Sequence, residues 1–162
     1  TAAGVSTRAF YEEFTGREDL LLALHDQVAA RAYDAMVETA AALGDVPLPE
    51  RTDAILCAFV RAACTDPKAA RIAFAEVLGV SPAVDQHRLQ WRNRFVEFAM
   101  VEIGRAIERG GAPQRDHGLT TIALIGAVNE LVVEWVVRGR TVPLETIATE
   151  AARMAYAAFT AS

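Results

Sequence analysis

The chain contains 162 residues, 52% of them hydrophobic, which is enough to bury the core of one or two small domains. Its formal net charge of -5 excludes a protein coated with positive charge, so contact with nucleic acid requires a small local cationic patch. Alanine and leucine are abundant and no credible strand pattern appears, so we expect an all-α protein.

The first segment, residues 1–14, is predicted to contain the end of one helix and a second, short helix. Gly4 permits a tight turn between them, and Ser6 can cap the second helix. The segment has no secretion-signal pattern, and Thr1 resembles an interior point of a longer protein. We therefore expect that the beginning of the protein is missing from this sequence.

A long helix is predicted from Thr15 to about Gly44. Thr15 stands three residues before Glu18, which is the spacing of a capping box. Apolar residues then recur at steps of four, and we expect them to form one buried stripe: Leu20, Leu24, Val28, Ala32, Met36 and Ala40.

Three more helices are predicted in the middle of the chain, over about 50–65, 68–78 and 82–109. Pro47 and Pro49 separate the first of them from the long helix, and Asp66 is expected to cap the second. Ser81 followed by Pro82 is a typical start for the third. Cys57 and Cys64 would lie about 10.5 Å apart along one helix, too far for a mutual disulfide, which fits a reducing, cytoplasmic setting.

The last two helices are predicted over about 114–138 and 143–159. The apolar run 119–137 approaches membrane-spanning length, but Asn129, Glu130 and Glu134 would be costly inside a bilayer. We therefore expect a helix that packs against protein, and no contact with a membrane. Glu134 stands four residues before Arg138, which favours a surface ion pair.

The segment from Ala3 to Leu20 resembles the end of the DNA-binding module in the tetracycline-repressor (TetR) family. The matching residues are Gly4-Val5-Ser6, Phe10-Tyr11, Phe14, Gly16, Arg17, Glu18 and Leu20. The family usually has Lys at the position of Arg17, and Glu12 and Glu13 add negative charge nearby. The family's first helix and most of its second have no counterpart here. A helical hairpin without DNA-binding function is the alternative interpretation of this segment.

The resemblance implies an all-α fold in which a truncated helix-turn-helix head precedes a helical ligand-binding and dimerisation bundle. Residues 1–16 would be the C-terminal part of the DNA-binding domain, and residues 17–162 the effector-binding and dimerisation domain. A recognition helix seated by its apolar face would offer Thr7 and Arg8 to base edges of double-stranded DNA. Tyr11 and Arg17 would contact phosphates.

A homodimer is expected because the family uses its two final helices for dimerisation and because apolar or small residues recur on both helices here. The predicted interface residues are Ile122, Ile125, Gly126, Val133, Val137, Ala151 and Ala155. The alternative is an intramolecular core helix that needs no partner.

A pocket for a small, largely apolar effector is predicted among the middle helices, where aromatic side chains converge. Its predicted lining residues are Phe59, Phe74, Trp91, Phe95 and Phe98, with Asn129 and Glu130 as polar contacts. Ordinary core packing is the alternative for each aromatic residue.

No catalytic motif or metal-ligand spacing is present, so we expect neither enzyme activity nor a metal or other cofactor. His25, His87 and His117 lie in separate segments and are expected to be solvated or at helix ends. The resulting hypothesis is a ligand-responsive DNA-binding repressor, released from its operator by the effector. The alternatives are a helical ligand-binding or scaffolding dimer with a degenerate DNA-binding head, and a small helical enzyme.

Overall fold

The computed structural model describes residue 14, residues 16–139 and residues 141–161. These residues form six α-helices and one π-helical turn, without strands, which confirms the predicted all-α class. The elements are α2 (Arg17–Ala42), α3 (Leu48–Ala63), α4 (Pro67–Arg71), η1 (Ile72–Glu76), α5 (Pro82–Glu108), α6 (Gly118–Val137) and α7 (Leu144–Thr160).

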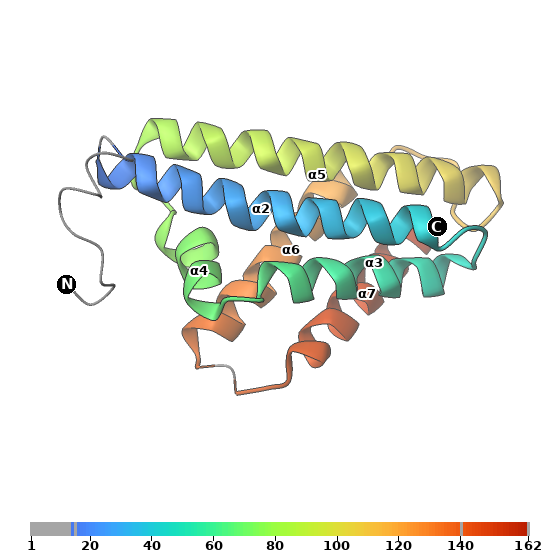
Figure 1. The fold of residues 1–162 in the computed structure, drawn as a ribbon. Coiled ribbons are helices and arrows are strands. Elements are labelled where there is room, and N and C mark those ends of the chain that lie inside the picture. The colour runs from blue at the N-terminus through green and yellow to red at the C-terminus, as the bar shows by residue number, and fades with distance from the viewer. Residues whose placement is uncertain (1–13, 15, 140, 162) are drawn as a thin grey trace.

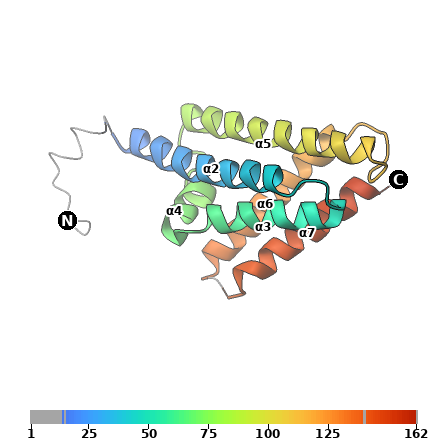
Figure 2. The ribbon, with the colours of Figure 1, turned by 45° about the vertical axis from the view of Figure 1, so that its right-hand side comes forward.

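The three helices α2, α3 and α5 run side by side, and α6 and α7 cross behind them (Figures 1 and 2). Helix α3 packs between α2 and α7, while α6 contacts both α5 and α7. The main core fills the space between α2, α3, α6 and α7, and includes Met36, Val60, Val132 and Ala151. This arrangement surrounds the middle of the bundle with four long helices.

The expected apolar stripe of α2 is confirmed along most of its length. Val28, Ala32, Met36 and Ala40 are buried, because steps of four keep them on the face that packs against the bundle. Leu20, close to the start of the helix, is 39% exposed. The stripe therefore anchors α2 to the bundle from Val28 onward.

The structure begins α2 at Arg17 with Gly16 as the cap residue, one residue later than the predicted capping box requires. Thr15, the hydroxyl partner of that box, lies outside the described residues. The Glu18 carboxylate instead accepts a hydrogen bond from the Ser81 hydroxyl at 2.9 Å. The first turn of α2 is thereby joined to the residue that caps α5.

Two predicted helix caps in the middle of the chain are confirmed. The Asp66 carboxylate accepts hydrogen bonds from the backbone N–H groups of Lys68 (2.9 Å) and Ala69 (3.3 Å). The Ser81 hydroxyl accepts one from the backbone N–H of Val84 at 3.3 Å.

The predicted helix over 68–78 differs from the structure, because α4 passes into the π-helical turn η1. The backbone N–H of Val77 donates to the carbonyl of Ile72 at 3.0 Å, a step of five residues where an α-helix has a step of four. Such a turn holds one more residue than an α-turn. It places Ala73 and Phe74 beside α2, where they pack against Val28 and Leu24.

Helix α5 ends at Glu108, within one residue of the predicted end, and a glycine pair closes it. Gly110 has φ 72, in the left-handed region, and its N–H donates to the carbonyl of Ile107 at 2.9 Å. The N–H of Gly111 donates to the carbonyl of Ala106 at 2.8 Å. This pair of hydrogen bonds is the Schellman arrangement that closes a helix.

Candidate ligand-binding site

The bundle contains two adjoining cavities. The larger one, which we call the arginine cavity, has a volume of about 290 Å³ and is bounded by α2, η1, α5 and α6. Its lining includes His25, Ala29, Phe74, Arg88, Trp91 and Arg92. The smaller one, the apolar cavity, has a volume of about 110 Å³ and lies toward α3 and α7; its lining includes Met36, Ile55, Phe98, Ile103, Leu124 and Phe159.

Four side chains line both cavities: Phe59, Phe95, Ile125 and Asn129. The rings of Phe59 and Phe95 meet edge to face with centroids 5.6 Å apart. The two cavities therefore share residues of α3, α5 and α6 as a common wall.

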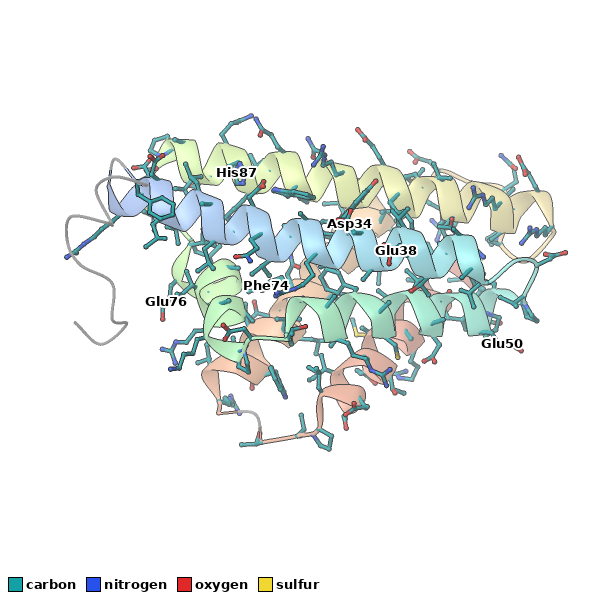
Figure 3. The ribbon with its side chains drawn as sticks, viewed as in Figure 1. Asp34, Glu38, Glu50, Phe74, Glu76 and His87 are labelled. Atoms are coloured by element: carbon teal, nitrogen blue, oxygen red, sulfur yellow. The ribbon has the colours of Figure 1, made fainter. Side chains whose placement is uncertain are left out.

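The structure brings six of the seven predicted pocket residues to these cavities. Phe74 and Trp91 line the arginine cavity, Phe98 lines the apolar cavity, and Phe59, Phe95 and Asn129 line both. Figure 3 shows Phe74, a residue of η1, below α2. Glu130 is exposed and lines neither cavity, because successive helical residues point about 100° apart and its neighbour Asn129 takes the inward position.

Sequence reasoning missed the two arginines that line the larger cavity. Arg88 and Arg92 stand four residues apart on α5 and share a face with Trp91 and Phe95. That spacing is visible in the sequence, and it is the signal that identifies them as inward-facing. No acidic residue is among the described residues that line this cavity, so its charged lining is cationic.

The two arginines differ in how they are paired. A terminal nitrogen of Arg88 lies 3.6 Å from the carboxylate of Asp85 on the same helix. Arg92 donates from a terminal nitrogen to the neutral amide oxygen of Asn93 at 3.1 Å. Its Nε is buried and has no hydrogen-bond partner among the described residues.

His25 contributes a neutral ring to the same wall. It is 9% exposed, and burial lowers its pKa to about 4, with His87 and Arg88 acting in the same direction and Asp26 opposing them. Its Nδ1 is buried without a hydrogen-bond partner among the described residues. The ring is therefore uncharged at neutral pH.

The expectation that the histidines are solvated or at helix ends is wrong for His25, which is buried within α2. The rings of His25 on α2 and His87 on α5 meet at a centroid distance of 5.3 Å, and Figure 3 shows His87 above α2. His117 stands at a helix end as expected, but it is 1% exposed, with Nε2 3.0 Å from the carbonyl oxygen of Pro113. Among the described residues no group of three or more His, Cys, Asp or Glu side chains is placed to hold a metal ion.

Asp26 joins α2 to α5 beside the arginine cavity. Its carboxylate accepts a hydrogen bond from Trp91 Nε1 at 2.9 Å and lies 3.5 Å from Nε2 of His87. With the contact between Glu18 and Ser81, this gives two side-chain connections between the first halves of the two helices. The starts of α2 and α5 are therefore held together by side-chain contacts.

The apolar cavity has a charged pair in its wall, but the two groups satisfy each other. The guanidinium of Arg51 binds the carboxylate of Glu102 and also donates to the carbonyls of Ala40 (2.9 Å) and Gly44 (3.1 Å). Glu102 receives a further hydrogen bond from Arg105 at 2.5 Å. This cavity therefore has a mainly apolar interior with no uncompensated charge from the pair.

Both cysteines are free, in agreement with the expected absence of a mutual disulfide. Burial raises the pKa of the Cys64 thiol to about 11 and also raises the pKa of Cys57. Both thiols are therefore protonated at neutral pH, which makes them weak nucleophiles.

The structure does not describe most of the predicted DNA-contacting residues. Thr7, Arg8 and Tyr11 lie outside the described residues. Arg17 is the first residue of α2 and is exposed, so its cationic side chain stands at the positive end of that helix dipole.

An apolar stripe of α6 remains uncovered in the single chain. Leu119 is 82% exposed, Ile122 41% and Val137 51%, while Gly126 is exposed and Val133 half-buried. The helix is also long and apolar enough to cross a membrane by length and composition, and 22% of that stretch is buried. The predicted apolar face therefore exists.

Three residues of the predicted dimer interface face inward. Ala151 and Ala155 on α7 are 0% and 5% exposed, because α7 packs against α3 of the same chain. Ile125 is half-buried and lines both cavities, whereas Ile122 and Gly126, which also line the arginine cavity, remain exposed. Small residues at helical spacing favour close packing in either case, so the sequence pattern did not distinguish a partner chain from the chain's own core.

No protein-family model and no curated protein sequence matches the chain. Among solved structures, it is similar to a putative TetR-family transcriptional regulator from Syntrophomonas wolfei str. Goettingen, with a TM-score of 0.75 and 20% identity, over 96% of this chain and 79% of that one. It is also similar to a bacterial regulatory protein in the TetR family from Rhodococcus RHA1, with a TM-score of 0.69 and 18% identity, over 99% of this chain and 83% of that one. The chain therefore has the fold of TetR-family regulators.

Proposed function

We propose that this chain is part of a ligand-responsive transcription repressor that binds an operator in double-stranded DNA and leaves it when an effector fills the bundle. The observation that carries the proposal is that α2, which follows the segment resembling a DNA-reading head, itself forms a wall of the arginine cavity. Both similar structures are named as regulators, which supports the same function and argues against an enzyme.

The DNA contacts are proposed from the resemblance of Ala3 to Leu20 to a recognition helix and its flanks. Thr7 and Arg8 would contact base edges, and Tyr11 and Arg17 would contact phosphates. Arg8 and Arg17 are the two cationic residues of this segment, so the proposed contacts depend on them in an otherwise acidic chain.

The proposed coupling acts through α2. His25, Val28, Ala29 and Ala32 line the arginine cavity, and the helix begins only two turns earlier, at Arg17. An effector that binds better when α2 is displaced would shift the population toward that arrangement. In a dimer, the two reading heads would then no longer match two successive major grooves.

We propose that the exposed stripe of α6 is the dimer interface. Ile122, Gly126, Val133 and Val137 follow one another at helical spacing, and Gly126 allows a partner backbone to approach closely. An uncovered apolar surface of this length is typical of a protein interface. A cytoplasmic location follows from the function.

A second candidate, a ligand-binding or scaffolding dimer with a degenerate head, is favoured by one feature. Glu12 and Glu13 lie next to the expected phosphate track, where negative charge weakens DNA binding. DNA binding by the protein distinguishes the two candidates directly.

The test is a fluorescence-anisotropy titration of the protein with DNA from upstream of its own gene, at several salt concentrations. We expect specific binding whose affinity falls steeply with salt, because phosphate contacts release counterions. The double variant Arg8→Ala with Tyr11→Ala should bind at least about tenfold more weakly. Arg153→Ala, an exposed residue of α7 paired with Glu150, is the control and should bind like wild type.

Equal affinity of the double variant and wild type would remove the basis of the DNA-binding assignment. Absence of any specific binding, in a protein that still binds small molecules, would favour the second candidate.

A further inference from the structure

We propose that the effector is an amphipathic anion whose carboxylate binds at Arg92 in the arginine cavity and whose apolar tail extends past Phe95 into the apolar cavity. The inference rests on the proposed function and names its ligand class. It is drawn from the unequal lining of the two cavities and from the side chains that they share.

The head group is assigned from an unsatisfied donor. Arg92 Nε is buried without a hydrogen-bond partner among the described residues, and its side chain lines the arginine cavity. A buried donor without an acceptor is costly, and each such group in a native fold calls for an explanation. A carboxylate at Arg92 supplies the acceptor and balances the guanidinium charge.

The other charged groups nearby leave Arg92 as the anchor. Asp85 faces Arg88 at 3.6 Å, and Asp26 is engaged by Trp91 and His87. Neither aspartate is among the residues that line the cavity. An anion entering there therefore meets a cationic wall without an acidic neighbour in the lining.

The tail is assigned to the second cavity because its wall is apolar and its charges are already paired. Ile103, Leu124 and Phe159 are buried and line that cavity. Arg51 in the same wall is bound to Glu102 and to two backbone carbonyls, so it has little capacity for a second anion. The opposite orientation, with the carboxylate at Arg51, is disfavoured.

The arginine cavity and the apolar cavity form one elongated binding site if the side chains that they share let a ligand pass between them. Phe95 and Ile125 are half-buried and line both cavities, so a ligand that passes from one cavity to the other must displace these two side chains. A ligand that occupied both cavities would touch α2 at two places, near Ala29 and near Met36. Tail length should therefore matter for affinity.

The test is isothermal titration calorimetry of the protein with decanoate, hexanoate and 1-decanol. Decanoate should bind about tenfold more tightly than 1-decanol, because only the carboxylate pairs with Arg92. It should also bind more tightly than hexanoate, whose tail is too short to fill the second cavity. Arg92→Met keeps most of the apolar stem and should remove the preference for decanoate over 1-decanol.

Arg109→Met is the matched control, since Arg109 ends the same helix, pairs with exposed Asp45 at 2.9 Å and is not among the lining residues of either cavity. This variant should retain the preference. Equal binding of decanoate and 1-decanol, no binding of either, or a preference that survives Arg92→Met would each overturn the proposal. Tight decanoate binding that leaves DNA affinity unchanged would contradict the proposed function and leave the ligand class standing.

Discussion

At the scale of single residues, the two cavities contain arginines in opposite states. Arg51 is 6% exposed and its guanidinium is fully engaged, whereas Arg92 keeps a buried Nε without a partner among the described residues. Removing a partner from a satisfied buried pair leaves an uncompensated charge, while an unsatisfied donor is available for a ligand. The first arginine should therefore matter for stability and the second for binding.

Arg51→Met should lower the free energy of unfolding by about 3 kcal/mol, because Glu102 and two carbonyl oxygens lose their donor. Arg105→Met is the control: it removes the exposed partner of the same carboxylate and should cost less than about 1 kcal/mol. Urea unfolding followed by circular dichroism measures both. Equal effects of the two substitutions would show that burial of the Arg51 pair is not what stabilises this end of the bundle.

His25 should make stability depend on pH. Its pKa is about 4 in the folded chain against 6.5 ordinarily, so between these values the unfolded chain binds more protons. The free energy of unfolding should therefore fall as the pH drops from 6.5 to 4, by up to about 3 kcal/mol. In His25→Gln this part of the decrease should be absent, and a pH profile of the urea midpoint that matches wild type would contradict the assignment.

At the scale of elements, the sequence predicted the boundaries of the helices better than it predicted how the helices pack against one another. Periodic apolar residues, prolines and caps such as Asp66 act locally, so they placed α2, α3, α5 and α7 within a few residues of their observed ends. The π-helical turn at Ile72 packs against α2 through Ala73 and Phe74, and no local pattern in the sequence indicates it. A local pattern could not have predicted it.

The region of the candidate site was also predictable from the sequence. Aromatic residues on three helices indicated where side chains converge, and six of the seven chosen residues line the cavities. The meeting of His25 with His87, and the division into two cavities, depend on how α2 and α5 pack. The sequence pattern assigned Ala151 and Ala155 to a partner chain, but both are buried in their own chain. Small residues pack as closely against α3 of the same chain as against a partner, so the pattern alone does not decide between the two.

At the scale of the whole molecule, the uncovered stripe of α6 predicts a dimer. Ile122→Glu combined with Val137→Glu should convert the dimer to a monomer at micromolar concentration, because two buried carboxylates without partners are costly. Val37→Glu on α2, with an exposure of 40% close to the 41% of Ile122, is the control and should remain dimeric. Sedimentation velocity measures all three proteins, and a dimeric double variant would place the interface elsewhere.

We propose that the content of the arginine cavity controls DNA binding through α2. A variant that fills this cavity tests the proposal without any ligand. Ala29 is 7% exposed and lines the cavity from α2, so Ala29→Leu places a larger side chain in that space. In an anisotropy titration with the upstream DNA, we predict that folded, dimeric Ala29→Leu protein binds about tenfold more weakly than wild type. Unchanged DNA affinity in a protein whose crystal structure shows the leucine filling the cavity would contradict the account.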